Sequence, residues 1–239
     1  MYIHKPRFGR NAQNLKKLVI AIDGPAASGK STTARLVARK LGYLFIDTGA
    51  MYRAMTLRIL EEGTNLVDKG RIFQLAESTR IRLEQDDGLR VYLDDRDVTR
   101  SIRGKAVTDA VSAVSSLKHV REVMVREQRR MSEHGGVVLE GRDIGTVVFP
   151  NADLKIYMIA ALKERARRRQ KELEQHGASV LVEQLETEIL ERDQRDSRRN
   201  LSPLRQAEDA IVLDTSNLTI EQQVEIIVNK AKELLQKQE

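Results

Sequence analysis

The sequence predicts an α/β protein: a five-stranded parallel sheet with helices on both faces, a small antiparallel insertion and a helical lid. Three observations predict this fold. Short apolar runs of strand length alternate with segments of helical periodicity along most of the chain. One stretch, residues 64–105, instead carries short alternating strands separated by turn residues. A strongly basic helix follows the fourth core strand.

The core begins with a continuous apolar run that ends at Asp23-Gly24-Pro25, a pattern typical of a buried parallel strand. The next segment has apolar residues at helical spacing and ends at Gly42, a residue that commonly terminates helices. In chain order, the elements predicted before the insertion are a strand at 18–22, a helix at 30–41, a strand at 43–46 and a helix at 49–60.

The insertion is predicted to contain three short antiparallel strands, because apolar and polar residues alternate in it with a period of two. These strands lie at 81–84, 90–93 and 97–99. The turn signals between them are Asp87-Gly88 and Asp94-Asp95.

The second half of the core follows the same alternating pattern. We predict a helix at 106–133, strands at 137–139 and 154–159, the basic helix at 163–174 with a turn at His176-Gly177, a helix at 183–196 and a strand at 210–213. Thr219 and Gln222 form a capping box, which opens the C-terminal helix.

These elements divide the chain into a core with inserted parts. The predicted divisions are a loose N-terminal tail at 1–16, core with the phosphate loop at 17–63, an acceptor-side insertion at 64–105, core at 106–162, the lid at 163–178 and core at 179–239.

Composition favours a protein that handles phosphates. The net charge is +6, and 27 of the 41 basic residues are arginine. The planar guanidinium group binds phosphate through two parallel hydrogen bonds, a geometry that lysine lacks. A solvated basic surface accounts for part of this bias.

Several classes of protein are not expected. The chain has no cysteine, hence neither a disulfide framework nor a thiolate metal site. No apolar run is long enough to span a membrane, and the first sixteen residues lack the apolar segment of a signal peptide. Only nine aromatic residues are present and no basic run is interleaved with them, so nucleic-acid binding is not expected. We expect a cytoplasmic monomer, although the sequence carries no direct signal for oligomeric state.

The segment from Gly24 to Ser31 matches the phosphate-loop pattern G-x-x-x-x-G-K-[ST] between a predicted strand and a predicted helix. Its glycines let backbone N–H groups surround an anion at the helix N-terminus. Lys30 is expected to bridge the β- and γ-phosphates, and the Ser31 hydroxyl to ligate the Mg²⁺ that accompanies ATP. The predicted ATP-binding residues of this segment are Gly24, Pro25, Ala26, Ala27, Ser28, Gly29, Lys30, Ser31 and Thr32.

This loop predicts that the chain binds a nucleoside triphosphate, but it does not indicate which reaction the chain catalyses. The base-reading motif N-K-x-D of GTPases is missing from the sequence. We assign none of the aspartates that follow predicted strands to the apolar-run-plus-Asp pattern that helps to hold magnesium in motor ATPases. The chain therefore looks like a small-molecule kinase.

Three further segments carry a family resemblance. They are Asp47-Thr48-Gly49-Ala50-Met51-Tyr52-Arg53, then Glu140-Gly141-Arg142-Asp143-Ile144-Gly145-Thr146, and Glu191-Arg192-Asp193-Gln194-Arg195-Asp196 with Ser197-Arg198-Arg199-Asn200 after it. With the phosphate loop, they resemble the bacterial cytidylate kinase family from about Leu18 to the C-terminus. The insertion at 64–105 matches the longer bacterial form of that family, and only the N-terminal tail departs from it.

The resemblance implies transfer of the γ-phosphoryl group of ATP to CMP or dCMP in pyrimidine nucleotide metabolism. Ligands of a parallel sheet lie at the carboxyl ends of its strands. The phosphate loop after the first strand, residues 47–53 after the second and Arg142-Asp143 after the third should therefore converge there. The residues that the resemblance assigns to CMP are Thr48, Arg53, Ser112, Arg121, Arg142, Asp143, Arg192 and Asp196. Among these, Arg53, Arg142 and Arg192 would hold the phosphate. Asp196 would bind the ribose hydroxyls.

Cytosine recognition is assigned to Asp143, Arg121 and Ser112. Cytosine offers an amino donor at N4 and acceptors at N3 and O2, which a carboxylate and two donors would satisfy. Uracil would place its O4 acceptor against Asp143, which would cost a few kcal/mol in a dry site. We therefore expect preference for CMP and dCMP over UMP.

Each assignment has a structural alternative. Asp143 could instead cap the turn that follows it, and Arg121 could lie on a solvated helix surface. Ser112 sits among small residues and could simply fill a helix. Asp47 could orient the phosphate loop without touching a ligand.

The basic helix is interpreted as a mobile lid over the donor site, with a solvated charged face as the alternative. Arg165, Arg168 and Arg169 are predicted to contact ATP, since they lie near one face of that helix. The attacking oxygen of the acceptor phosphate is already ionised, so no general base is required. Catalysis is assigned to Lys30, Arg192 and Arg199, with Mg²⁺.

Two other readings remain open from the sequence. The first is a kinase of the same fold that acts on AMP, UMP or a sugar-like alcohol, for which Asp47 could serve as base. The second is an ATPase that depends on RNA or DNA, which predicts salt-sensitive stimulation by nucleic acid.

Overall fold

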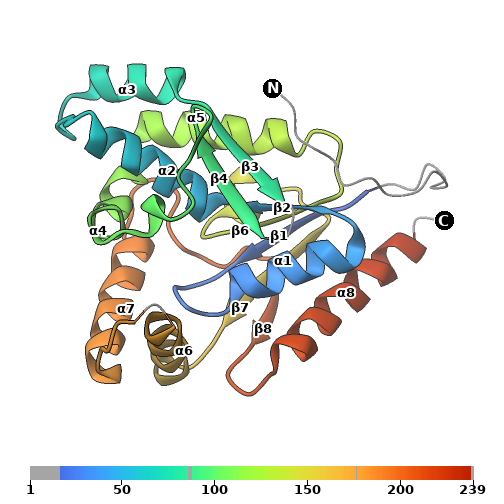
Figure 1. Ribbon diagram of the computed structural model, residues 1–239. Coiled ribbons are helices and arrows are strands. Elements are labelled where there is room, and N and C mark those ends of the chain that lie inside the picture. Colours follow the sequence, from blue (N-terminus) through green and yellow to red (C-terminus); the bar gives the residue numbers. More distant parts are fainter. Residues whose placement is uncertain (1–16, 86–87, 176, 238–239) are drawn as a thin grey trace. The chain divides into compact units, whose positions relative to one another are not determined.

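The computed structural model describes residues 17–85, 88–175 and 177–237 of the chain (Figure 1). These residues form two compact units. One unit runs from Ile46 to Glu133. The other combines the residues up to Phe45 with those from His134 onward, and we call it the core unit.

The core unit holds the parallel sheet, and its elements follow the predicted alternation. In chain order they are β1 (Val19–Asp23), α1 (Lys30–Leu41), β2 (Leu44–Asp47, of which Leu44 and Phe45 belong to this unit), β6 (Val137–Gly141), the π-helical turn η2 (Ile144–Val148), β7 (Leu154–Ile159), α6 (Leu162–Glu174), α7 (Val182–Ser197), β8 (Ile211–Asp214) and α8 (Ile220–Gln236).

The five strands of the sheet have the order β2-β6-β1-β7-β8, which confirms the predicted fold class. Strand β1 runs parallel to both β6 and β7, and β7 runs parallel to β8. The central position of β1 explains its continuous apolar sequence, because Ile20, Ala21 and Ile22 have no solvent exposure. The residue that ends β1, Asp23, lies beside Gly141 of β6 and Tyr157 of β7. Segments that follow β1 and β6 therefore start side by side.

Helices α1 and α8 pack against each other on one face of the sheet (Figure 1). A buried hydrogen bond joins them, in which the Thr33 hydroxyl donates to Gln223 Oε1 over 2.8 Å. The predicted stop of α1 is confirmed, since Gly42 adopts a left-handed conformation with φ of 66°. The predicted capping box of α8 is also confirmed, with Thr219 and Gln222 each bonded to the other's backbone.

The second unit contains the predicted antiparallel insertion together with helices. Its elements are α2 (Thr48–Glu61), α3 (Lys69–Ser78), β3 (Ile81–Gln85), β4 (Leu89–Leu93), β5 (Arg96–Asp97), the 3₁₀ turn η1 (Ser101–Arg103), α4 (Lys105–Val114) and α5 (Lys118–Met131). As predicted, the three strands form an antiparallel sheet; their order is β3-β4-β5, and the third spans Arg96–Asp97 instead of the predicted 97–99. The turn at Asp94-Asp95 is confirmed, with φ of 47° and 69°. Asp87 and His176, which belong to two other predicted turns, lie outside the described residues.

The single helix predicted over 106–133 is wrong, because the chain forms α4 and α5 with a break between them. The Ser115 hydroxyl donates to the Ser112 carbonyl and that of Ser116 to the Ala113 carbonyl, which favours the end of a helix. Leu117 then adopts an extended conformation with φ of −70° and ψ of 125°. Helix α3 was not predicted at all, although Asp68 caps it by accepting a hydrogen bond from Arg71 N.

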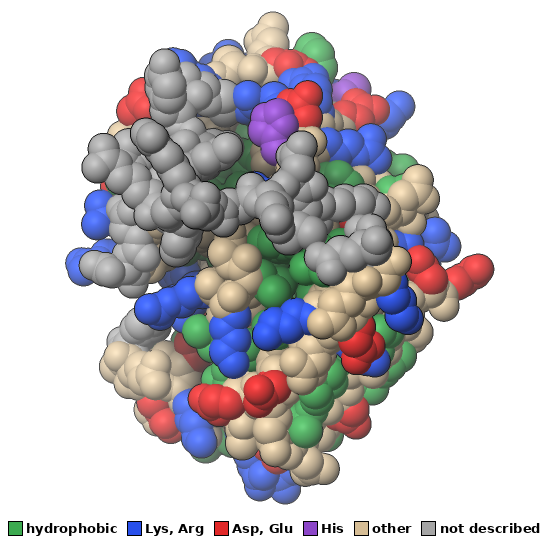
Figure 2. Space-filling view, turned by 90° about the vertical axis from the view of Figure 1, so that its right-hand side faces the viewer, with side chains coloured by type: hydrophobic (Ala, Val, Ile, Leu, Met, Phe, Trp, Pro, Cys, Tyr) green, Lys and Arg blue, Asp and Glu red, His purple; other side chains and the backbone are tan. Residues whose placement is uncertain are grey.

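The domain boundaries predicted from the sequence stay predictions. No helix among the described residues is long and apolar enough to cross a membrane. On the face drawn in Figure 2, basic and acidic side chains are interspersed.

Candidate active site

The predicted phosphate loop connects β1 to α1 in the core unit, in the expected strand–loop–helix context. Its backbone has positive φ angles at Gly24 (148°), Ala27 (57°) and Gly29 (94°). Only glycine fits at position 24, because a Cβ there would lie 2.1 Å from the carbonyl oxygen of Met158 on β7. Gly29 provides no side-chain cap for α1, so the first N–H groups of that helix stay available for an anion.

Lys30 is folded back onto this loop and is nearly fully buried. Its ammonium group donates to the Pro25 carbonyl over 2.5 Å and to Ser28 Oγ over 3.2 Å. Burial, together with the positive charges of Arg142 and Arg192, lowers the pKa of Lys30 to about 7. Lys30, Arg142 and Arg192 thus form a group of cations that a bound anion would stabilise.

Ser31 opens α1 beside a carboxylate that sequence reasoning missed. Its hydroxyl donates to Oε1 of Glu140 over 2.5 Å. Glu140 lies within β6 directly after the buried residues 137–139. The sequence did show an apolar strand followed by an acidic residue at this position, but we searched only for aspartate as a residue that helps to hold magnesium. Thr32, the last predicted loop residue, is partly exposed in the first turn of α1.

Two of the predicted acceptor residues form an ion-pair cluster with Arg199. Asp196, on α7, receives a hydrogen bond from Arg142 Nε over 3.0 Å and contacts Arg199 through its other oxygen. Burial favours the neutral acid, but Arg142, Arg199 and Arg192 outweigh it and lower the pKa of Asp196. Burial of Arg142 favours its neutral form, but Asp196 and Glu140 together outweigh burial and raise the pKa of that guanidinium group.

Asp143 follows β6 and is buried, with 5% of its surface exposed. Its backbone carbonyl accepts hydrogen bonds from Val147 N and Val148 N in η2. Its side chain does not cap this turn, so the structural alternative considered from the sequence is wrong. The other orienting contact of η2 comes from Asp23, whose two carboxylate oxygens accept from Ile144 N and Gly145 N.

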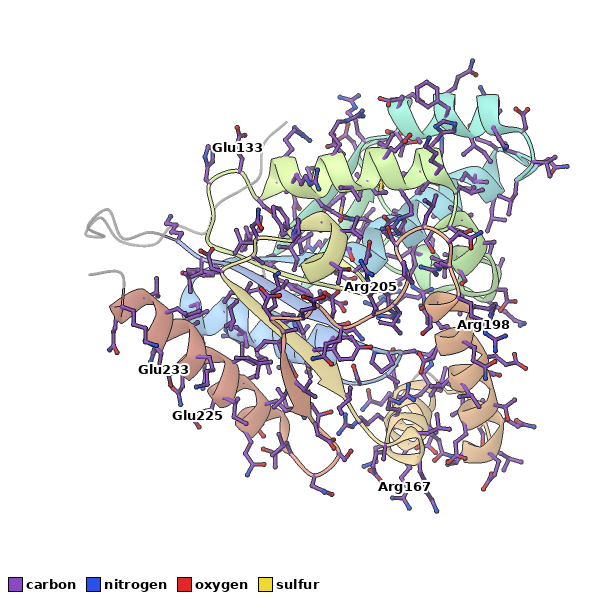
Figure 3. All side chains as sticks on the ribbon, turned by 180° about the vertical axis from the view of Figure 1, so that it is seen from behind. Glu133, Arg167, Arg198, Arg205, Glu225 and Glu233 are labelled. Atoms are coloured by element: carbon purple, nitrogen blue, oxygen red, sulfur yellow. The ribbon has the colours of Figure 1, made fainter. Side chains whose placement is uncertain are left out.

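The arginines of α6 separate into inward and outward groups. Arg165 is buried and donates to the Ala26 carbonyl, and Arg168 donates to the Ser28 carbonyl. Arg167 and Arg169 instead pair with glutamates of their own helix. Figure 3 shows Arg167 pointing away from the sheet. The solvated-face interpretation therefore fits part of this helix, whereas two of the predicted lid arginines touch the phosphate loop itself.

Helix α7 is also joined to the phosphate loop. Asp193 Oδ1 accepts a hydrogen bond from Ala26 N over 3.0 Å, and Oδ2 contacts Arg165. Beside this polar contact lies an apolar cluster of Ala26, Ala166, Leu185 and Ile189. The α6–α7 hairpin is thus packed onto the loop by apolar and ionic contacts together.

The other predicted acceptor residues lie in the second unit. Arg53 on α2 donates to the Ile102 carbonyl and to Thr108 Oγ1, at 3.3 and 2.9 Å. Thr48 is buried at the start of the same helix. Asp47 caps this helix by accepting from Ala50 N over 2.8 Å, which gives it a structural role.

Arg121 on α5 is buried, which rules out the surface alternative considered from the sequence. Its guanidinium group lies 5.5 Å from the centre of the Tyr52 ring and donates to the Ser115 carbonyl. Ser112 lies on α4 and is partly buried.

The structure therefore brings Lys30, Arg142, Arg192, Asp196 and Arg199 together within the core unit. The predicted convergence of these residues with Arg53, Ser112 and Arg121 of the second unit stays a prediction. Among the described residues, no group of three or more His, Asp or Glu side chains is arranged to hold a metal ion by itself.

Comparisons with known proteins agree with this geometry. Residues 20–233 match the protein family described as cytidylate kinase. The chain belongs to the cytidylate kinase family. Cytidylate kinases from Streptococcus suis and Bacillus subtilis are 48% and 47% identical to it, over 92% and 91% of this chain and 99% and 98% of theirs. That of Chloroherpeton thalassium is 50% identical over 92% of this chain and 95% of its own. A shikimate kinase structure from Bacteroides thetaiotaomicron covers 92% of this chain at a TM-score of 0.46 and 15% identity, a likeness too distant to bear on function.

Proposed function

We propose that this chain transfers the γ-phosphoryl group of ATP to CMP and dCMP, giving ADP and the cytidine diphosphate. Membership of the cytidylate kinase family supports this activity. The observation that carries it in the structure is the group of cations around the phosphate loop, in which burial, with the added charges of Arg142 and Arg192, lowers the pKa of Lys30. Such a group of positive charges would stabilise the phosphates of two substrates that bind next to each other.

On the donor side, ATP phosphates would bind the loop residues 24–32 at the start of α1. Lys30 would exchange its contact with the Pro25 carbonyl for β- and γ-phosphate oxygens. Arg165 and Arg168 already touch the loop and are the best placed lid arginines for ATP. Arg169 pairs with Glu172 and would need to leave that partner.

On the acceptor side, Arg53, Arg142 and Arg192 would bind the CMP phosphate. Asp196 binds Arg142 and Arg199 in the free protein. A CMP phosphate that drew Arg142 toward itself would free one carboxylate oxygen of Asp196 for the ribose hydroxyls. The ion pair would thus hold the two side chains in place until substrate arrives.

Base recognition would fall to Asp143, Arg121 and Ser112. The buried carboxylate of Asp143 would accept a hydrogen bond from cytosine N4 and repel uracil O4. Arg121 and Ser112 would donate to the ring acceptors. A site built to bind a particular donor rejects an analogue that lacks it by several orders of magnitude, because its own groups are then left unpaired.

The chemical step needs no general base, since the attacking phosphate oxygen of CMP is ionised. Lys30, Arg192 and Arg199 would neutralise charge on the transferring group and orient the attacking oxygen. Thr48 would complete the acceptor site at the start of α2.

Ser31 in the first turn of α1 and Glu140 in β6 fit a magnesium ion that arrives with ATP. Ser31 Oγ and the Glu140 carboxylate are oxygen donors in direct contact, and Mg²⁺ prefers oxygen ligands. Bound Mg²⁺ would supply positive charge to the β- and γ-phosphate oxygens, with Ser31 as a direct ligand and Glu140 orienting it.

An ADP-release assay across CMP, dCMP, UMP, AMP and shikimate tests the proposal. CMP and dCMP should give turnover, with kcat/KM at least about a hundredfold above that for UMP. Asp143→Asn should lose most of this preference, whereas Asp214→Asn, an exposed carboxylate of the same unit, should keep it. Turnover with AMP or shikimate instead of CMP would contradict the proposal. Its monomeric state and cytoplasmic location stay predictions.

A further inference from the structure

Asp23 is a buried carboxylate for which the proposed mechanism has no use. It ends β1 one residue before the phosphate loop, and 5% of its surface is exposed. Burial raises its pKa to about 6 even though two backbone hydrogen bonds oppose that change. Keeping an ionisable group in such a place costs stability, so its contacts need an explanation.

Both oxygens of Asp23 are bound to the turn that follows β6. Oδ1 accepts from Ile144 N over 2.8 Å, and Oδ2 accepts from Gly145 N over 2.7 Å. The turn's own hydrogen bonds begin later, with Val147 N and Val148 N donating to the carbonyl of Asp143. The first N–H groups of a helical turn have no partner within it, so Asp23 supplies the missing acceptors from another strand.

This contact fixes the position of two of the residues to which the proposed function assigns CMP binding. Arg142 and Asp143 directly precede the two bound amides. The turn is confined on its other side, because a Cβ on Gly145 would lie 3.1 Å from Cδ of Lys155. Lys155 cannot easily withdraw, since its ammonium group is bound to the Pro150 carbonyl and to Asp209.

The same strand end fixes the donor loop. Gly24 is bonded to Asp23 and packs so closely on β7 that no side chain fits there. Asp23 therefore joins the start of the phosphate loop to the start of the acceptor turn. Misplacement of a reacting group by about 1 Å can lower the rate about a hundredfold. A contact that fixes both segments should therefore affect the rate of phosphoryl transfer.

We propose that Asp23 is a positioning residue for nucleobase specificity: by holding the amides of Ile144 and Gly145, its carboxylate sets where Asp143 meets the base of the acceptor. This proposal rests on the proposed function, since it needs Asp143 to read the base. Asp23 itself touches no substrate in this account.

The test compares Asp23→Asn with a matched control at the opposite end of β1. Asp153 accepts a hydrogen bond from Val19 N over 2.8 Å, so Asp153→Asn disturbs a similar contact of the same strand away from the site. For each variant, kcat and KM are measured for CMP and UMP at saturating ATP, and KM for ATP at saturating CMP.

In Asp23→Asn we expect the ratio of kcat/KM for CMP to that for UMP to fall at least about tenfold, because an amide can accept only one of the two hydrogen bonds. KM for ATP should change less than KM for CMP. Asp153→Asn should keep the wild-type ratio. An unchanged ratio in Asp23→Asn, or an equal loss in Asp153→Asn, would overturn the proposal.

A second variant covers the case in which Asp23→Asn does not fold. Gly145→Ala displaces the turn against Lys155 without removing the carboxylate, and it should lower the same ratio. An unchanged ratio in Gly145→Ala would also overturn the proposal. A wild-type chain that does not prefer CMP would instead overturn the assignment of Asp143, whatever the variants do.

Discussion

Asp193 links the α6–α7 hairpin to the phosphate loop, and removal of its side chain should destabilise that contact. The side chain accepts a hydrogen bond from Ala26 N and pairs with Arg165. Asp193→Ala leaves a buried loop N–H without its acceptor and the guanidinium group of Arg165 without its counter-ion. The side chain of Asp193 is 14% exposed and that of Arg165 is 10% exposed, so water can replace few of the lost polar contacts.

The size of the effect follows from these two losses. An unsatisfied buried donor costs about 1–3 kcal/mol, and breaking a fully buried ion pair costs about 3–5 kcal/mol. Because both groups keep some exposure, we expect the free energy of unfolding to fall by about 2–4 kcal/mol in total. For a chain of this size, that loss lowers Tm by roughly 5–15 °C.

Urea unfolding of three variants separates the contributions. Asp193→Asn keeps an oxygen for Ala26 N but loses the charge, so its stability should lie between those of the wild type and Asp193→Ala. Glu164→Ala is the control, because it breaks a more exposed pair with Arg167 on α6 and should change stability by less than about 0.5 kcal/mol. If Asp193→Ala were no less stable than Glu164→Ala, the link between hairpin and loop would be refuted.

Three further predictions concern the loop and the helix ends. The pKa of Lys30 is lowered to about 7, so this lysine is mostly neutral at pH 8 in the free protein. ATP should restore its proton, and calorimetry in buffers of different ionisation enthalpy should show proton uptake, with affinity falling as pH rises above 7. Asp47→Asn should keep both stability and CMP turnover, because asparagine caps α2 equally well and no base is needed. Thr219→Ala should lower the free energy of unfolding by about 1 kcal/mol through loss of its cap on α8.

Each of these has a clear contrary result. ATP binding without proton uptake at pH 8 would mean that Lys30 is charged in the free protein. A large loss of turnover in Asp47→Asn, with stability intact, would point to a base and hence to an alcohol acceptor. A Thr219→Ala variant as stable as the wild type would show that the capping hydrogen bond contributes nothing.

The parts predicted well from the sequence are those specified locally. The phosphate loop, the stop at Gly42 and the cap at Thr219 each depend on residues within a few positions of one another. The parallel sheet followed from the alternation of strands and helices, whereas the order of its strands was not predicted. The break between α4 and α5 was missed because two serines end this helix, whereas serine is also tolerated inside helices.

The parts that could not be predicted depend on contacts between distant residues. Ser31 meets Glu140, Ala26 meets Asp193, and Asp23 meets Ile144, each across more than a hundred positions of the chain. No local pattern marks such partners, since each contact arises only when the fold brings distant segments of the chain together. The polar contacts that hold the site in shape could therefore not be predicted from the sequence. Candidate substrate-binding residues, in contrast, could be named from it.

A crystal structure of the chain with CMP and ADP bound tests the central claim most directly. The account predicts the cytosine amino group within hydrogen-bonding distance of the Asp143 carboxylate, and the CMP phosphate between Arg142 and Arg192. The ADP phosphates should lie in the loop at the start of α1. A CMP molecule bound away from Arg142 and Asp143 would contradict the account.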